Sequence, residues 1–139
     1  MKVFVLFCVV LLAVAVVSAK KAKPTEEDKP KSLKKVVKEC QRNEATKVDN
    51  AVLKKIKKHK PVDIPDNYGD HKLCILKGIG FINENGTVNE DNLKKRVTKK
   101  AEEGDDVNAI VTECKDPGKT AQETAIKIDT CLNKHSIDL

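Results

Sequence analysis

The chain has 139 residues, with 27 Lys plus Arg against 21 Asp plus Glu, three Phe, one Tyr and no Trp. This length suits one domain and excludes a multi-domain machine. After the first 19 residues the aromatic side chains are Tyr68 and Phe81, which excludes an aromatic stacking platform for single-stranded nucleic acid. The core must therefore be built from Val, Ile and Leu, and a core of this kind gains from covalent crosslinks.

Residues 1–19 have the pattern of a secretory signal peptide. Lys2 gives a positive start, an apolar run extends from Val3 to Val17, and Val17-Ser18-Ala19 fits a signal peptidase site. The run is shorter than the ~20 residues that a membrane-spanning helix needs. We therefore expect cleavage after Ala19 and secretion to the extracellular space. Residues 20–31, rich in charge and proline, are expected to form a flexible arm ahead of a domain over 32–139.

The rest of the chain shows helical spacing of apolar residues and no convincing alternation of the strand type. Potential N-caps and chain breaks divide it into six segments. A first helix starts at Ser32, a second at Asp49 or Asn50, a third runs from Asp66 to about Ile82, a fourth from about Glu90 to near Gly104, a fifth from Asp105 or Asp106 to Pro117-Gly118, and a sixth from Thr120. The sequence therefore predicts an all-α fold of about six short helices.

Four of the five cysteines remain once Cys8 leaves with the signal peptide: Cys40, Cys74, Cys114 and Cys131. In an oxidising compartment an even number of cysteines predicts disulfides, here two, and four cysteines allow three pairings. A zinc site is disfavoured because no C-x₂-C or H-x₃₋₅-H spacing is present. His71 and Cys74 lie one helical turn apart, which alone is a weak indication of a metal.

The cysteine spacing resembles that of insect odorant-binding proteins of the pheromone/general-odorant-binding type. Full members carry six cysteines, with three residues between the second and third and eight between the fifth and sixth. Here Asp70 and Gln122 stand at the positions of the second and fifth cysteines. The stretch from Cys74 to Asn89 (CILKGIGFINENGTVN) also matches the family's third helix and the turn after it. The chain is thus similar to a "C-minus" member that keeps the first, third, fourth and sixth cysteines.

The resemblance implies a fold, a disulfide pairing and a function. The pairing would be Cys40 with Cys74 and Cys114 with Cys131, in a compact helical bundle around an apolar cavity. The function would be that of a secreted carrier for odorants, pheromones or other small lipophilic molecules, without a cofactor. The partners would be a small apolar ligand and a membrane receptor but no nucleic acid, and the protein would be a monomer or a weak homodimer.

The candidate ligand-lining residues are the aliphatic side chains on the inward faces of the predicted helices. Burial of an aliphatic ligand returns ~25 cal/mol per Å² removed from water, so an apolar cavity alone supports micromolar affinity. Plain core packing is the alternative role for each of these residues. They are Val36, Val37, Ile56, Leu73, Leu76, Ile79, Leu93, Val97, Ile110, Val111, Ile126 and Ile128.

Other features point to no chemistry. The chain has no G-x-S-x-G, H-E-x-x-H or P-loop motif, so an enzyme is disfavoured. A calcium loop near Asn83 is rejected because Phe81 and Asn92 occupy ligand positions. The remaining alternative is a secreted structural or interaction protein of venom, saliva or haemolymph without cargo.

Two surface features remain. The lysine clusters, such as Lys54-Lys55 and Lys94-Lys95, are interspersed with acidic residues along the chain and are interpreted as solvated surface. Asn85-Gly86-Thr87 is an N-glycosylation sequon in a predicted turn, so Asn85 is a candidate glycosylation site.

Overall fold

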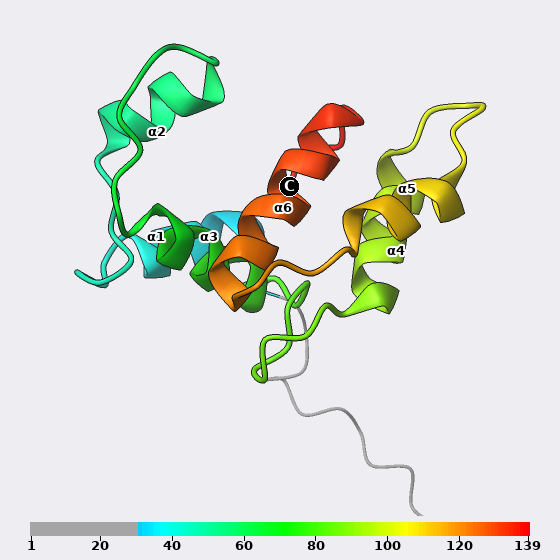
Figure 1. Ribbon diagram of the computed structural model, residues 1–139, viewed down its shortest axis with the longest axis horizontal. Coiled ribbons are helices and arrows are strands. Elements are labelled where there is room, and N and C mark those ends of the chain that lie inside the picture. Colours follow the sequence, from blue (N-terminus) through cyan, green and yellow to red (C-terminus); the bar gives the residue numbers. More distant parts are fainter. Residues whose placement is uncertain (1–30) are drawn as a thin grey trace, which may run out of the picture.

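The computed structural model describes residues 31–139 (Figure 1). The predicted signal peptide and all but the last residue of the predicted arm lie outside the described residues. Six helices follow one another along the chain: α1 Leu33–Cys40, α2 Asn50–Lys57, α3 Tyr68–Gly78, α4 Glu90–Lys100, α5 Val107–Cys114 and α6 Ala121–Lys134. Residues 31–139 otherwise show one isolated antiparallel bridge, between Ile82 and Val88. The prediction of an all-α fold with six short helices is confirmed.

Side-chain caps explain where most of these helices begin. The side chains of Asp49, Asn89, Asp106 and Thr120 each accept a hydrogen bond from a backbone N–H in the first turn of α2, α4, α5 and α6. These bonds satisfy donors that a helix N-terminus otherwise leaves without a partner. Ser32 stands at the N-cap of α1 as predicted, but its side chain makes no capping bond.

Two helices end earlier than predicted. The third was expected to reach Ile82, but Gly80 adopts a left-handed conformation (φ 79°). The N–H of Gly80 then donates to Lys77 O and that of Phe81 to Leu76 O, the bonding pattern that closes a helix at glycine. The fourth was expected to end near Gly104. It stops at Lys100, and beyond it the Asp105 carboxylate accepts the backbone N–H of Glu102, which favours a local turn over further helix.

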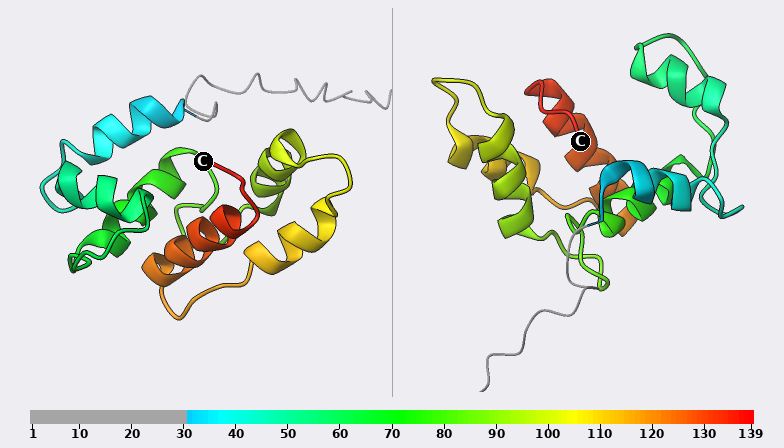
Figure 2. Two further views of the ribbon diagram at one scale, coloured as in Figure 1. Left: turned by 90° about the horizontal axis from the view of Figure 1, so that it is seen from above. Right: turned by 180° about the vertical axis from the view of Figure 1, so that it is seen from behind.

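The helices form a chain of pairwise contacts with α6 in the middle. Helix α3 packs against α6 and α1, and α5 packs against α6 and α4. Helix α2 lies at one end of the molecule and packs against none of the other helices of the described chain (Figures 1 and 2). None of the helices within residues 31–139 is both long and apolar enough to cross a membrane.

Two disulfides crosslink this arrangement. Cys40–Cys74 joins α1 to α3 with 6.0 Å between the Cα atoms, and Cys114–Cys131 joins α5 to α6 with 5.3 Å. Both Cα separations lie in the usual range for a disulfide. The pairing that the resemblance implied is confirmed.

The core consists of two clusters of buried apolar side chains. The larger one lies among α3, α4, α5 and α6 and also takes in residues 81–82 and Ile137 near the end of the described chain. The smaller one, with Val36, Cys40 and Ile75, lies between α1 and α3. Ile79 is partly buried and packs against both clusters, so the two are continuous.

Candidate ligand-binding site

Half of the predicted ligand-lining residues meet in the larger core cluster. Helices α3, α4, α5 and α6 each bring at least one of them there, and all are nearly or fully inaccessible to solvent. Leu73 and Ile79 are partly buried and pack against the edge of this cluster. The six are Leu76, Leu93, Val97, Ile110, Val111 and Ile128, with exposed fractions from 0 to 7%. The structure therefore brings together the most apolar predicted side chains of four helices at one place, which we call the central cluster.

The other predicted residues lie elsewhere. Val36 is buried and Val37 partly buried in the smaller cluster between α1 and α3. Ile56 lies on α2, a helix without any buried residue. Ile126 is 36% exposed because it lies beside the inward stripe of α6 that Ala125 and Ile128 form. Ile56 and Ile126 therefore do not contribute to the central cluster.

The central cluster also contains side chains that sequence reasoning missed. Leu132 continues the stripe of Ile128 one helical turn further, a signal that periodicity does carry. Ile137 is only 1% exposed although it lies beyond α6. It turns inward because Ser136 is left-handed (φ 56°), so that the N–H of Ile137 donates to Leu132 O. No spacing rule predicts such a return of the chain.

The interface of α3 and α6 carries polar contacts at the place where the six-cysteine pattern has a disulfide. Gln122 Nε2 donates to Asp70 Oδ1 at 3.0 Å. One turn further along each helix, Lys72 Nζ lies 2.7 Å from Asp129 Oδ2, and both side chains are largely buried. The positions assigned to the missing cysteines are therefore in direct contact, and a hydrogen bond joins them instead of a covalent bond.

A buried histidine lies beside this ion pair. His71 is 2% exposed, and its Nδ1 lies 2.8 Å from the carbonyl oxygen of Thr46. Because a carbonyl only accepts, Nδ1 carries the proton and donates it. Burial lowers the pKa of His71 below its ordinary value, and the charge of Lys72 acts in the same direction. The Thr46 bond and Asp129 oppose this shift. His71 is thus held in its neutral form between α3 and the segment that precedes α2.

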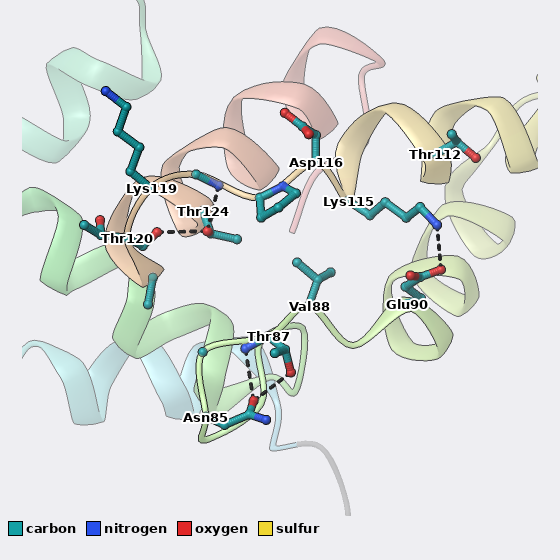
Figure 3. A pocket seen from close by; sticks show the side chains of 14 residues that line it. Asn85, Thr87, Val88, Glu90, Thr112, Lys115, Asp116, Lys119, Thr120 and Thr124 are labelled. Atoms are coloured by element: carbon teal, nitrogen blue, oxygen red, sulfur yellow. Dashed lines mark hydrogen bonds and ion pairs between the residues drawn. The ribbon is translucent and has the colours of Figure 1, made fainter.

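Two pockets open at the surface, and the first is polar. It has a volume of about 620 Å³ and lies between the turn at 85–88, the start of α4 and the connection from α5 to α6 (Figure 3). Lys115 Nζ and Glu90 Oε2 pair across it at 3.0 Å, and Thr124 accepts the N–H of Gly118. Threonines and charged groups provide most of its wall, so it suits a polar molecule better than a lipophilic one.

The second pocket lies over the Cys114–Cys131 disulfide and measures about 340 Å³. Ile126 lines it, together with charged side chains such as Glu113 and Lys134. His135 Nε2 lies within 4.8 Å of both disulfide sulfurs, but those sulfurs are bonded to each other and His135 pairs with Glu113 at 2.9 Å. The cluster as it stands is therefore a salt-bridged helix end.

The His71 and Cys74 pair considered for zinc is likewise engaged in other bonds. Cys74 is disulfide-bonded to Cys40, and His71 donates to Thr46. A zinc ion needs thiolate sulfur, which the disulfide does not offer.

Comparison with known proteins now adds a family. The profile of the PBP/GOBP family matches residues 22–135. The chain belongs to the PBP/GOBP family. Two relatives are the B2 protein and the B1 protein of Tenebrio molitor, which are 28% and 27% identical over 110 residues. The alignment covers 79% of this chain and 83% and 82% of theirs.

Membership and geometry agree on the kind of site. The four cysteines that this PBP/GOBP chain keeps form two disulfides, as a C-minus member requires. The four helices that carry Cys74, Cys114, Cys131 and the central cluster's α4 residues surround an aliphatic interior. The predicted cavity itself stays a prediction, since the central cluster side chains pack together and the two pockets described above lie at the surface.

Proposed function

We propose that this protein is a secreted carrier that binds small hydrophobic ligands among α3, α4, α5 and α6. The observation that carries the proposal is the convergence of six predicted lining residues in the central cluster of a PBP/GOBP chain. Such a site binds by removing apolar area from water and needs no reactive group. The proposal therefore includes no catalytic step, and the protein is proposed to be a carrier and not an enzyme.

The central cluster suits a lipophilic ligand better than either surface pocket does. Its side chains are Leu, Ile, Val, Phe, Ala and Cys, without a charged group among them. An apolar molecule in the polar groove of Figure 3 would instead cover threonine hydroxyls and the Lys115–Glu90 pair. Covering such groups without replacing their hydrogen bonds costs free energy. A ligand that enters the central cluster separates aliphatic side chains and leaves no polar group unsatisfied.

The proposal is tested with a fluorescent lipophilic probe, N-phenyl-1-naphthylamine, and its displacement by long-chain alcohols and esters. Val111→Phe adds a ring inside the central cluster, and Ile64→Phe adds it at a side chain that is 55% exposed. We expect micromolar probe binding by the natural chain, about tenfold weaker binding by Val111→Phe and unchanged binding by Ile64→Phe. Circular dichroism checks that each variant is folded.

Two results would contradict the carrier proposal. If folded natural protein bound no lipophilic probe, the alternative of a structural or interaction protein without cargo would take its place. If Val111→Phe and Ile64→Phe bound the probe equally well, binding would not involve the central cluster. Turnover of ester or phosphate substrates by the purified protein would contradict the non-enzymatic role.

We also propose that Asn85 carries an N-linked glycan, which requires the predicted passage through the secretory pathway. Asn85 is exposed in the turn at 83–86, and its Oδ1 accepts both the N–H and the hydroxyl of Thr87 (Figure 3). Its Nδ2, the atom that a glycan modifies, has no partner within residues 31–139. Expression in insect cells should give a glycoform that peptide N-glycosidase removes and that Thr87→Ala abolishes. A secreted protein with the bare polypeptide mass would contradict this proposal.

A further inference from the structure

The end of α2 holds the densest run of positive charge in the described chain. Between Asp49 and Asp63 there is no acidic residue, and residues 54–60 contain five lysines and one histidine. All six side chains are exposed. We call this set the α2 basic patch; it consists of Lys54, Lys55, Lys57, Lys58, His59 and Lys60.

The lysines of the α2 basic patch differ from those elsewhere in having no carboxylate partner within residues 31–139. Lys72, Lys77, Lys115, Lys127 and Lys134 each form an ion pair with an Asp or Glu. No ion pair or side-chain hydrogen bond of the described chain involves a lysine of the patch. Five like charges are thus concentrated without local neutralisation, which costs free energy by mutual repulsion and creates a strong positive field.

The helix that carries the patch makes little contribution to the core. It packs against none of the other described helices, and Val52, Leu53 and Ile56 are only partly buried. Figure 1 shows it at the opposite end of the molecule from α4 and α5. The role of α2 in this fold is therefore not explained by packing.

The backbone at the patch gives a second, independent observation. His59 is left-handed (φ 51°), and its N–H donates to Ile56 O while that of Lys60 donates to Lys55 O. Glycine is the residue favoured at this position of a helix end, and α3 does have Gly80 there. A side chain costs ~1 kcal/mol in this conformation. The chain thus keeps an unfavourable histidine, and the turn brings Lys60 back beside Lys55.

We propose that the α2 basic patch binds a sulfated polysaccharide. Lysine ammonium groups are compact charges with three donors each, and they pair with sulfate oxygens without a fixed geometry. A nucleic acid is disfavoured because the segment has no Arg to read bases and no aromatic side chain to stack on them. A membrane is disfavoured because insertion needs an exposed apolar face, and the aliphatic side chains of α2 are partly buried.

The test uses heparin as the sulfated polysaccharide and two variants of equal charge. The triple variant Lys54→Gln, Lys55→Gln, Lys58→Gln removes three charges of the patch. The control, Lys94→Gln, Lys95→Gln, Lys99→Gln, removes three exposed charges of α4 with similar spacing. Glutamine retains helix propensity, so neither change should unfold its helix.

We expect the natural chain to bind heparin with an affinity that falls steeply as NaCl rises, because counterions are released on binding. At about 50 mM NaCl the patch variant should bind at least tenfold more weakly, and the control less than threefold. N- and O-desulfated heparin should bind no better to the natural chain than to the patch variant.

Each contrary result overturns the proposal. Equal losses in the two triple variants would show that binding reflects net charge and not the patch. Absence of heparin binding by the natural chain at low salt would exclude the partner. Tighter binding to vesicles of 70% phosphatidylcholine and 30% phosphatidylglycerol than to heparin would assign the patch to a membrane instead.

Discussion

Helices α3 and α2 show how differently two helices of one small protein use their side chains. Helix α3 buries residues on several faces, among them Tyr68, His71 and Leu76, and packs against both α1 and α6. Its charged groups Asp70 and Lys72 are matched by partners on α6. Helix α2 buries none of its residues and leaves its lysines without carboxylate partners in the described chain. Both helices have apolar residues at helical spacing, so periodicity alone does not distinguish a core helix from a displayed one.

The largest effect that distinguishes the two helices is the placement of a charge on each. Leu76→Asp puts a carboxylate at a position that is 0% exposed, in the central cluster. It should reduce the free energy of unfolding by about 4 kcal/mol or more. Ile56→Asp on α2 is the matched control and should cost less than about 2 kcal/mol. Urea unfolding monitored by circular dichroism measures both, and equal losses would contradict the distinction between the helices.

A smaller effect, in the opposite direction, is expected where α3 meets α6. Asp70→Cys with Gln122→Cys should form a third disulfide, since the two side chains are already hydrogen-bonded and a Cβ on the neighbouring Gly69 would approach Gln122 Cβ to 2.9 Å. The loop it closes is long, so a gain of about 3 to 4 kcal/mol is expected before strain. Intact mass shows the bond, and melting with and without reductant measures its contribution. A bonded variant that melts at or below the natural temperature would contradict it.

His71 makes the stability of α3 depend on pH. Because its folded pKa lies below its unfolded value of about 6.5, the unfolded chain takes up the proton first as pH falls. Stability is therefore full above that pH and declines through the interval down to the folded pKa, by at most about 1.4 kcal/mol per pH unit for one proton. His71→Asn can keep the donor to Thr46 without the titration. Parallel urea curves from pH 7.5 to 5 should show a decline in the natural chain that this variant lacks.

The smallest expected effect is at the end of α2. His59→Gly relieves a left-handed conformation and should raise the free energy of unfolding by about 0.5 to 1 kcal/mol. The matched reverse change, Gly80→Ala at the end of α3, should lower it by a similar or larger amount. Thermal melts compare the two. A destabilised His59→Gly would show that the histidine side chain supports the fold and would remove one argument for the α2 basic patch.

Much of the fold could be predicted from local chemistry. Asp49, Asp106 and Thr120 were predictable as caps because their side chains suit the first turn, and the inward spacing of Leu93 with Val97 placed α4. The disulfide pairing was not predictable in this way, since four cysteines allow three pairings, and it came from the family resemblance. The end of α3 was misplaced because apolar residues continue to Ile82 although Gly80 turns the chain.

The candidate site was predictable only in part, for a reason that individual residues make clear. Leu76 and Ile128 were expected inside because they lie on apolar stripes, and they are there. Ile56 satisfies the same rule but lies on a helix that no other described helix covers, and Ile137 is buried without belonging to any stripe. Periodicity shows which face of a helix is apolar. It does not show which helices meet, because that depends on turns such as the one at Ser136.

The distribution of the crosslinks has a consequence for motion. Of the four helices around the central cluster, α3, α5 and α6 each carry a disulfide cysteine, whereas α4 has none. Helix α4 is held by the packing of Leu93 and Val97 and by Arg96, whose guanidinium donates to the carbonyl oxygen of Asp138. Local opening is easiest where packing alone resists it. The amide protons of α4 should therefore exchange with deuterium sooner than those of α3 or α6, and ligands would reach the interior on its side.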